Sequence, residues 1–428
     1  QAEDGIRDAQ ESRGLGDVYK RQGKYRYGVT FACDGSESGG MSRVLKSIAL
    51  ILFFSIALSA KQSVPAAERS ELYLPLLKGK RVALVVNHSS LVGRAHLVDF
   101  LLKNSIKIRK IFAPEHGFRG KADAGAHIKS SRDTRTNLPI VSLYGKHKKP
   151  TKKDLAGIDL ILFDIQDVGV RFYTYLSTLH YVMEAGAEYH VPVVVLDRPN
   201  PNGHYIDGPV LQKKYRSFVG LDPVPVVYGM TIGEYARMLN GERWLKGGAQ
   251  TKLTVVPLAN YTHKSFYSLP VKPSPNLPND RAIALYPSLA FFEGTVFSAG
   301  RGTRKPFELY GAPEYRIQKF SFVPRPRAGA KYPKFKGKRC WGADLSGRSL
   351  SAIRREKELN LSYLLDAYQN YPDKRKFFLK NRFMDKLAGT STLRKQVTSG
   401  MSESAIRKSW QKELNQFKQI RKKYLLYP

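Results

Sequence analysis

The sequence has few cysteines and lacks the short motifs of zinc and nucleotide enzymes. Only Cys33 and Cys340 occur in 428 residues, which excludes a disulfide framework and a cysteine-based zinc site. There is no H-E-x-x-H motif, no G-x-G-x-x-G motif after a strand pattern and no G-x-x-x-x-G-K-[ST] motif. These are the usual signatures of zinc proteases, dinucleotide enzymes and P-loop NTPases. We therefore expect neither a metal site nor a cofactor.

Acidic residues are also scarce relative to basic ones. The chain has 71 Lys and Arg against 36 Asp and Glu, a formal net charge of +35. Such a charge suits nucleic acid, an anionic membrane or an anionic wall polymer as a partner. No helix-turn-helix, zinc-finger, RRM or KH pattern is present, and the basic residues are not concentrated in one helix, so we do not expect nucleic acid to be the partner. A basic nucleic-acid binder remains an alternative, which steep salt dependence without sugar specificity would favour.

Long apolar runs are missing except for one near the start. Ile48–Leu58 follows the basic residues Arg43 and Lys46 and precedes small residues, the order found in secretory signal peptides. It is about half of the roughly 20 residues that a membrane-spanning helix needs. We predict a signal peptide at 41–66 and no stable membrane span after its cleavage. The periplasm is the expected location and the extracellular space the alternative. Residues 1–40 lack apolar periodicity, and we expect them to be a non-native leader.

Short β-branched runs alternate with helical patterns between residues 70 and 210, which predicts a Rossmann-like, doubly wound parallel sheet. The runs do not alternate polar and apolar residues, as expected for strands buried on both faces. The expected strands are Val82–Asn87, Ile106–Phe112, Leu138–Leu143, Ile158–Ile165 and Val191–Leu196, with helices at Ala95–Lys103 and Phe172–Glu188.

A second α/β unit is expected over 211–428. Thr231 and Glu234 have the spacing of a capping box that begins a helix. Leu253–Leu258 is a strand candidate in this unit. The prolines of 272–278 predict a rigid loop, and a basic helix is expected near Ser404–Tyr424.

Clusters of polar residues directly follow apolar runs, at 113–120, 163–172 and 196–203. The carboxyl ends of parallel strands share one edge of a sheet, where ligands bind in open α/β folds. In the first cluster, Glu115 beside His116 suits general acid–base catalysis; the other interpretation is a surface turn. In the second, Asp164 and Asp167 suit divided acid and base roles, metal binding, or capping of the next helix.

Other candidates have equally simple structural interpretations. Asp197 and Arg198 suit an internal ion pair that positions a loop. Arg301 and Arg304 offer forked donors for carboxylates or phosphates, or are solvated surface charge. Tyr173 suits stacking on a sugar, although aromatic residues at helical spacing are often core.

Several long motifs occur in a fixed order along the chain: P-E-H-G at 114–117, F-D-I-Q-D at 163–167, D-R-P-N-P at 197–201, S-P-N-L-P at 274–278 and F-E-G-T at 292–295. This set resembles the exo-acting N-acetylmuramidase family of bacterial wall-recycling glycoside hydrolases. The resemblance runs from about Arg81 to Tyr427. It implies a Rossmann-like subdomain packed against a second α/β subdomain, with the active site in the cleft between them.

The resemblance also implies a reaction: release of N-acetylmuramic acid from the non-reducing end of peptidoglycan fragments, with a muropeptide or muramyl–glucosamine saccharide as substrate. Glu115 is our candidate general acid, tuned by His116, with Asp164 or Asp167 as partner carboxylate or with participation of the substrate's 2-acetamido group. The candidate substrate-binding residues are Gln166, Arg171, Tyr173, Asp197, Arg198, Asn276, Glu293, Arg301 and Arg304. The alternatives are a non-catalytic peptidoglycan-binding protein and a β-N-acetylglucosaminidase. Stereochemical outcome and oligomeric state stay open.

Overall fold

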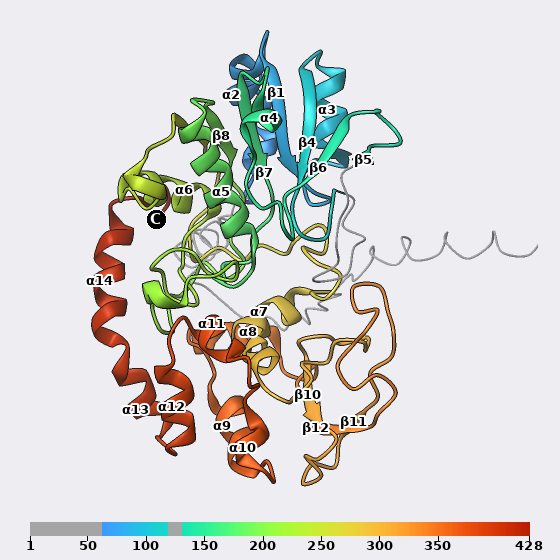
Figure 1. Ribbon diagram of the computed structural model, residues 1–428, viewed down its shortest axis with the longest axis vertical. Helices are drawn as coiled ribbons and strands as arrows, with labels where there is room; N and C mark the ends of the chain where they lie inside the picture. Colours follow the sequence, from blue (N-terminus) through green and yellow to red (C-terminus); the bar gives the residue numbers. More distant parts are fainter. Residues whose placement is uncertain (1–61, 119–130) are drawn as a thin grey trace, which may run out of the picture. The chain divides into compact units, whose positions relative to one another are not determined.

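The computed structural model describes residues 62–118 and 131–428, and a seven-stranded sheet organises its N-terminal half (Figure 1). The strand order is β5-β6-β4-β1-β7-β8-β9. Every neighbouring pair is parallel except β5 with β6. The strands are β1 (Arg81–Val86), β4 (Lys107–Ala113), β5 (Ser131–Arg132), β6 (Pro139–Ser142), β7 (Leu160–Asp164), β8 (Val193–Leu196) and β9 (Leu253–Val256). The order reverses between β1 and β7, the switch point at which open α/β sheets bind ligands.

Helices cover both faces of this sheet, which confirms the predicted doubly wound architecture. In β1, Val82 and Leu84 belong to the core that contains α2 and α3. The alternate residues Ala83 and Val85 belong to the core that contains α5 and α6. The helices are α2 (Ser70–Leu77), α3 (Leu97–Lys103), α4 (Lys152–Leu155), α5 (Tyr175–Glu188) and α6 (Ile232–Gly241). A short hairpin of β2 (Leu91–Val92) and β3 (Ala95–His96) precedes α3.

The sheet extends beyond the boundary expected at residue 210. Leu253–Val256, which we assigned to the second unit, forms β9 and pairs in parallel with β8. Its residues are mostly half-buried or exposed, as expected for an edge strand, so its apolar pattern is weaker than that of the central strands.

The predicted signal peptide overlaps the folded part of the chain at its C-terminal end. Val64 pairs with Ala259, and the Ser63 hydroxyl donates to the Asn260 carbonyl at 3.1 Å. Ala66 is fully buried at the start of a 3₁₀ helix, Ala66–Glu68. Residues 62–66 therefore belong to the fold, whereas 1–61, which hold the predicted leader and most of the predicted signal peptide, lie outside the described residues. No helix among the described residues is long and apolar enough to cross a membrane.

The C-terminal half combines a small antiparallel sheet, ordered β10-β12-β11, with short helices (Figure 1). The strands are β10 (Leu309–Ala312), β11 (Ser321–Phe322) and β12 (Cys340–Asp344). The helices are α7 (Asp280–Leu289), α8 (Leu350–Glu356), α9 (Ser362–Asn370), α10 (Lys374–Phe377), α11 (Phe383–Ala388), α12 (Thr392–Thr398), α13 (Glu403–Ser409) and α14 (Gln411–Lys422). The single basic helix predicted at 404–424 is two helices, because the backbone breaks at Trp410 (φ −106°, ψ 3°).

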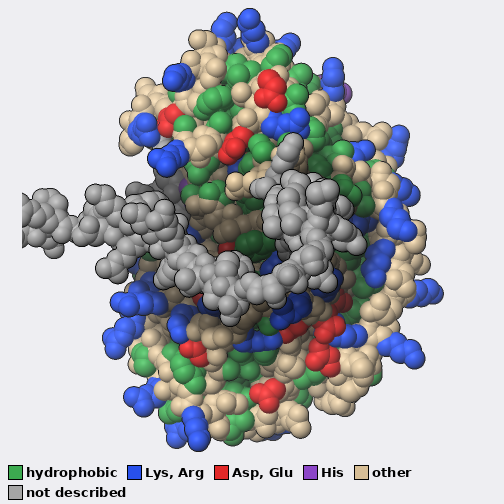
Figure 2. Space-filling model, turned by 180° about the vertical axis from the view of Figure 1, so that it is seen from behind, with side chains coloured by type: hydrophobic (Ala, Val, Ile, Leu, Met, Phe, Trp, Pro, Cys, Tyr) green, Lys and Arg blue, Asp and Glu red, His purple; other side chains and the backbone are tan. Residues whose placement is uncertain are grey.

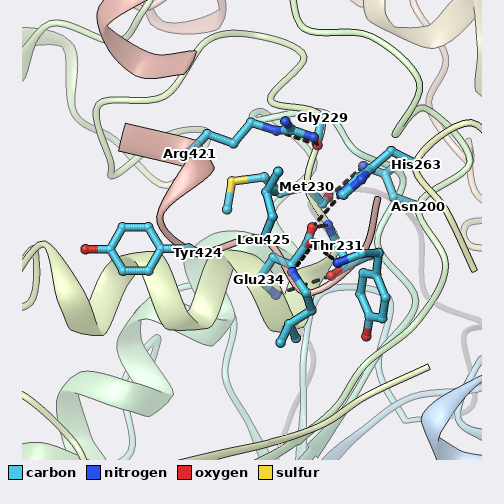
Figure 3. A network of polar contacts seen from close by, with 12 residues as sticks. Asn200, Gly229, Met230, Thr231, Glu234, His263, Arg421, Tyr424 and Leu425 are labelled. Carbon is cyan, nitrogen blue, oxygen red and sulfur yellow. Dashed lines mark hydrogen bonds and ion pairs between the residues drawn. The ribbon is translucent and has the colours of Figure 1, made fainter. Parts of the chain in front are cut away.

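The end of the chain is tied to the sheet-bearing half through the start of α6 (Figure 3). The predicted capping box is present: the Thr231 hydroxyl accepts from the Glu234 amide, and the Glu234 carboxylate accepts from the Thr231 amide at 2.9 Å. Glu234 also accepts from His263 at 2.8 Å and from the Leu426 amide at 2.8 Å. Arg421 donates to the Gly229 carbonyl at 2.9 Å. This network fixes the C-terminal segment against the start of α6 and the loop that carries His263.

Candidate active site

A cleft of about 930 Å³ lies between the strand ends and the C-terminal half. Its walls come from the loops after β4, β6 and β7 on one side, and from 274–277, 286–307 and 329–334 on the other. Figure 2 shows this part of the surface hollowed, with Lys and Arg side chains gathered along one margin. The volume falls at the upper end of the range for small-molecule sites.

Glu115 faces this cleft from a tight turn after β4. The turn closes when the Gly117 amide donates to the Pro114 carbonyl at 3.0 Å, and both His116 (φ 69°) and Gly117 (φ 73°) have left-handed backbone. Glu115 Oε2 accepts from the Thr174 hydroxyl at 2.6 Å. Tyr144 also donates to this carboxylate, and burial together with Glu115 raises the pKa of Tyr144 to about 12.

The second carboxylate among the described residues of the cleft is Glu293, which follows α7. Glu293 Oε1 accepts from Arg301 Nε at 3.1 Å, and the guanidinium stacks 4.9 Å from the centre of the Phe307 ring. Burial opposes the charge on Arg301, but Glu293 and then Glu115 raise its pKa. Arg301 thus lies in the field of both carboxylates, which brings the two acids to the same part of the cleft.

Aromatic side chains form much of the remaining wall. The rings of Tyr173 and Tyr175 meet edge to face, with their centroids 4.7 Å apart. Tyr173 also meets Tyr286 edge to face, with a centroid distance of 6.0 Å. The Tyr173 hydroxyl donates to the Pro273 carbonyl at 2.7 Å. Such rigid aromatic faces suit the apolar faces of sugars.

Asp164 does not line the cleft. It is fully buried at the end of β7, where its two oxygens pair with Arg198 Nε at 2.5 Å and Nη2 at 2.8 Å. Arg198 is only 3% exposed and also donates to the Leu91 carbonyl at 3.1 Å. Our interpretation of Asp164 as a partner carboxylate is therefore not supported: both it and Arg198 act in a buried, bidentate structural pair.

Asp167 lies below the cleft rather than in its wall. Its Oδ2 accepts from the Gly169 amide at 2.6 Å and from the Tyr228 hydroxyl. Its Oδ1 is buried and meets no described partner. Burial raises the pKa of Asp167 to about 7, against these hydrogen bonds. Asp167 holds the loop that leads to Tyr173, and its placement does not favour direct contact with a substrate.

We expected Asp197 to form an ion pair with Arg198, but the side chain of Arg198 pairs with Asp164 instead. Asp197 is fully buried and accepts from the Thr231 hydroxyl at 2.7 Å, the Gly233 amide at 2.8 Å and the Tyr427 hydroxyl at 2.7 Å. It therefore caps the N-terminus of α6, as favoured for an anion at that position.

Two other candidate binding residues are structural. Gln166 is buried and donates to the carbonyls of Asp167 and Pro199, both at 2.7 Å. Arg171 is 1% exposed and donates to the carbonyls of Pro209, Val224 and Leu387.

Asn276 and Arg304 are placed differently. Asn276 lines the cleft while donating to the Gly329 carbonyl at 2.8 Å. Arg304 is exposed and borders an adjoining cavity instead of the cleft.

The structure adds side chains that the sequence did not single out. Thr174 holds Glu115 directly. Lys334 lines the cleft and donates to the carbonyls of Thr295 and Phe297 at 2.7 and 2.8 Å. No sequence signal distinguishes Lys334 from the many other basic residues of the chain. Thr174 could be recognised as a candidate only from the structure, which shows that it directly precedes α5.

Among the described residues, no group of three or more His, Cys, Asp or Glu side chains is arranged to hold a metal ion. The cleft itself combines a hydroxyl-bound glutamate, an Arg-bound glutamate and aromatic walls. These features define the protein as an α/β protein with a site of the glycoside-hydrolase type, in which paired carboxylates flank a sugar-sized space.

Comparisons with known proteins identify the family. A profile described as "Exo-beta-N-acetylmuramidase NamZ, N-terminal" matches residues 82–281, and its C-terminal counterpart matches 284–427. The chain belongs to this family, and the profile boundary places β9 with the N-terminal part. A curated relative, "Peptidoglycan beta-N-acetylmuramidase NamZ" of Bacillus subtilis strain 168, is 41% identical over 373 residues, covering 83% of this chain and 89% of the relative.

Solved structures agree with this assignment. A DUF1343 family protein of Bacteroides fragilis NCTC 9343 is 46% identical with a TM-score of 0.80. A second one from the same organism is 29% identical with a TM-score of 0.71. Each match covers 86% of this chain and 99% of the solved chain.

Proposed function

We propose that the protein is an exo-acting glycoside hydrolase that releases N-acetylmuramic acid from the non-reducing end of peptidoglycan fragments. Family membership and the activity named for the Bacillus subtilis relative support the reaction. The observation that carries the assignment to a site is the placement of Glu115 and Glu293 in one aromatic cleft.

Glu115 is the general acid of this proposal. Its partners Thr174 and Tyr144 are hydroxyls, which accept hydrogen bonds as well as donate them. The contacts therefore persist whether Glu115 carries its proton or has transferred it to the leaving oxygen. His116, 6% exposed in the same turn, also lines the cleft.

Glu293 is the second carboxylate, in place of Asp164 or Asp167. It forms an ion pair with Arg301, and a carboxylate at this position suits stabilisation of the positive charge that develops at the anomeric carbon or orientation of the 2-acetamido group. Only Nε of Arg301 donates to Glu293. The other guanidinium donors are then available to the carbonyl oxygen of the lactyl group, which is present with or without an attached peptide and which N-acetylglucosamine lacks.

Export to the compartment that holds peptidoglycan follows from the same proposal. The basic and apolar pattern before Ala60 supports a signal peptide. Ser63 and Val64 make contacts within the fold. We therefore place the cleavage site before residue 62, so that the mature protein keeps these contacts. Export to the periplasm is the expected outcome.

The acid role is tested by Glu115→Gln, which keeps the shape of the side chain but removes its proton. We expect kcat/KM on a muramyl–glucosamine disaccharide to fall about 10²–10⁴-fold. The matched control is Glu413→Gln, an exposed residue of α14, which should leave turnover unchanged. Near-normal turnover of a folded Glu115→Gln protein would remove Glu115 from the mechanism.

The same measurement distinguishes the proposed enzyme from a non-catalytic peptidoglycan-binding protein. The latter predicts equal binding of the disaccharide to wild type and to Glu115→Gln, and hydrolysis by neither. A β-N-acetylglucosaminidase instead predicts no hydrolysis of this disaccharide, and release of N-acetylglucosamine from a disaccharide that has N-acetylglucosamine at its non-reducing end.

A further inference from the structure

A second cavity of about 930 Å³ adjoins the cleft and has no role in the chemistry described above. The two spaces share Ser274, Asn276 and Ala330 as lining residues. The cleft alone has the volume of a small-molecule site and is large enough for two sugar rings. The adjoining cavity is therefore available for a group attached to the sugar in the cleft.

The charge of this cavity is entirely positive among its described lining residues. Lys272, Arg304 and Arg327 border it, and no described Asp or Glu does. None of these three cations forms an ion pair with a described carboxylate, whereas in the cleft Arg301 is paired with Glu293. Unpaired guanidinium groups at the edge of a cavity are suited to carboxylates or phosphates.

The cavity wall is held in place by specific contacts. Asn276 donates to the Gly329 carbonyl, which ties the proline-rich segment to the loop that carries Arg327. Gly329 has φ +84°, and a Cβ there would lie 2.4 Å from Pro275 Cβ. Only glycine permits this close approach, so the loop pairing that forms the wall depends on it.

His88 also borders the cavity but adds no charge to it. One ring nitrogen, Nε2, lies 2.7 Å from the Lys272 carbonyl and must donate to it, because a carbonyl only accepts. Burial lowers the pKa of His88, which favours the neutral ring. The charge of the cavity therefore comes from Lys272, Arg304 and Arg327.

We propose that this cavity is a subsite for an acidic peptide attached to the lactyl group of the terminal muramic residue. An acidic peptide supplies carboxylates for Arg304 and Arg327 and is long enough to occupy a cavity of about 930 Å³. A phosphate substituent would satisfy the cations but leave most of this volume unfilled. This inference rests on the proposed function, since the sugar in the cleft is what delivers the peptide.

The test compares two substrates of the full-length protein: a muramyl–glucosamine disaccharide with a free lactyl carboxylate, and the same disaccharide bearing an acidic tripeptide. We expect a higher kcat/KM for the peptide-bearing substrate. In Arg304→Gln/Arg327→Gln the ratio of the two values should fall about tenfold, the loss expected for charge-assisted hydrogen bonds. Arg325→Gln removes a charge from the same loop but does not line the cavity, and it should leave the ratio unchanged.

Binding of non-hydrolysable probes by calorimetry separates the possible failures. The probes are N-acetylmuramic acid, its 6-phosphate and N-acetylmuramoyl tripeptide. Hydrolysis of both disaccharides with a ratio that the double variant does not change would overturn the subsite and leave the proposed function intact. If neither disaccharide is hydrolysed but the muramoyl tripeptide binds through the two arginines, the reaction is wrong and the subsite stands. Tighter binding of the 6-phosphate overturns the peptide assignment, and binding of no probe overturns the subsite.

Discussion

Replacement of Asp167 by Asn should change how the stability of the protein depends on pH. Asp167 is 4% exposed, and burial raises its pKa from 3.8 to about 7. The folded state therefore retains a proton that the unfolded chain has already released at pH 5. Between pH 5 and pH 8 the folded wild type ionises this buried group. It should lose about 2–3 kcal/mol of unfolding free energy relative to a variant that cannot ionise.

Urea unfolding followed by tryptophan fluorescence at pH 5, 6, 7 and 8 measures this difference. The stability of Asp167→Asn minus that of wild type should rise with pH through the whole range. Asp159→Asn is the control: Arg81 holds the pKa of Asp159 well below its usual range. Asp159 is therefore ionised in both states from pH 5 to 8, and its difference curve should be flat. Parallel curves for wild type and Asp167→Asn would refute the reasoning that burial raises the pKa of Asp167 despite its hydrogen bonds.

Two further substitutions test the scaffold of the site. Arg198→Met leaves the buried Asp164 without its bidentate partner and should lower the unfolding free energy by about 3–5 kcal/mol; chemical denaturation checks this, and a loss below about 1 kcal/mol would show that the pair is not desolvated. Gly329→Ala places a methyl group 2.4 Å from Pro275 Cβ and should cost about 1–3 kcal/mol by strain and crowding. Gly337→Ala has the same sign of φ (+76°) with nothing within 4 Å, so equal melting temperatures for the two variants would contradict the crowding argument.

The sheet was predictable because its central strands carry uninterrupted apolar runs. All five residues of β7 are buried, and the five strands and two helices predicted up to β8 occur in the predicted order. The short elements β2, β3, β5 and α4, together with α2, were not predicted. β9 was misassigned because an edge strand lacks that pattern. The capping box at Thr231 was predictable because it depends on residues only three positions apart.

The site was less predictable, because residues at the ends of different strands lie in different environments. Glu115 and Asp164 both lie at the carboxyl end of a strand, yet one faces the cleft and the other is enclosed. The difference comes from Arg198, which reaches Asp164 from the end of the neighbouring strand. Contacts between side chains 34 residues apart leave no periodic signal in the sequence.

The most direct test of the proposed function is mass spectrometry of the products from defined oligosaccharides of alternating N-acetylmuramic acid and N-acetylglucosamine. One set ends in N-acetylmuramic acid at the non-reducing end and the matched set ends in N-acetylglucosamine. Exo-muramidase action predicts free N-acetylmuramic acid from the first set alone, and loss of that product in Glu115→Gln. Release of N-acetylglucosamine from the second set, or free N-acetylmuramic acid at the wild-type rate from Glu115→Gln, would contradict it.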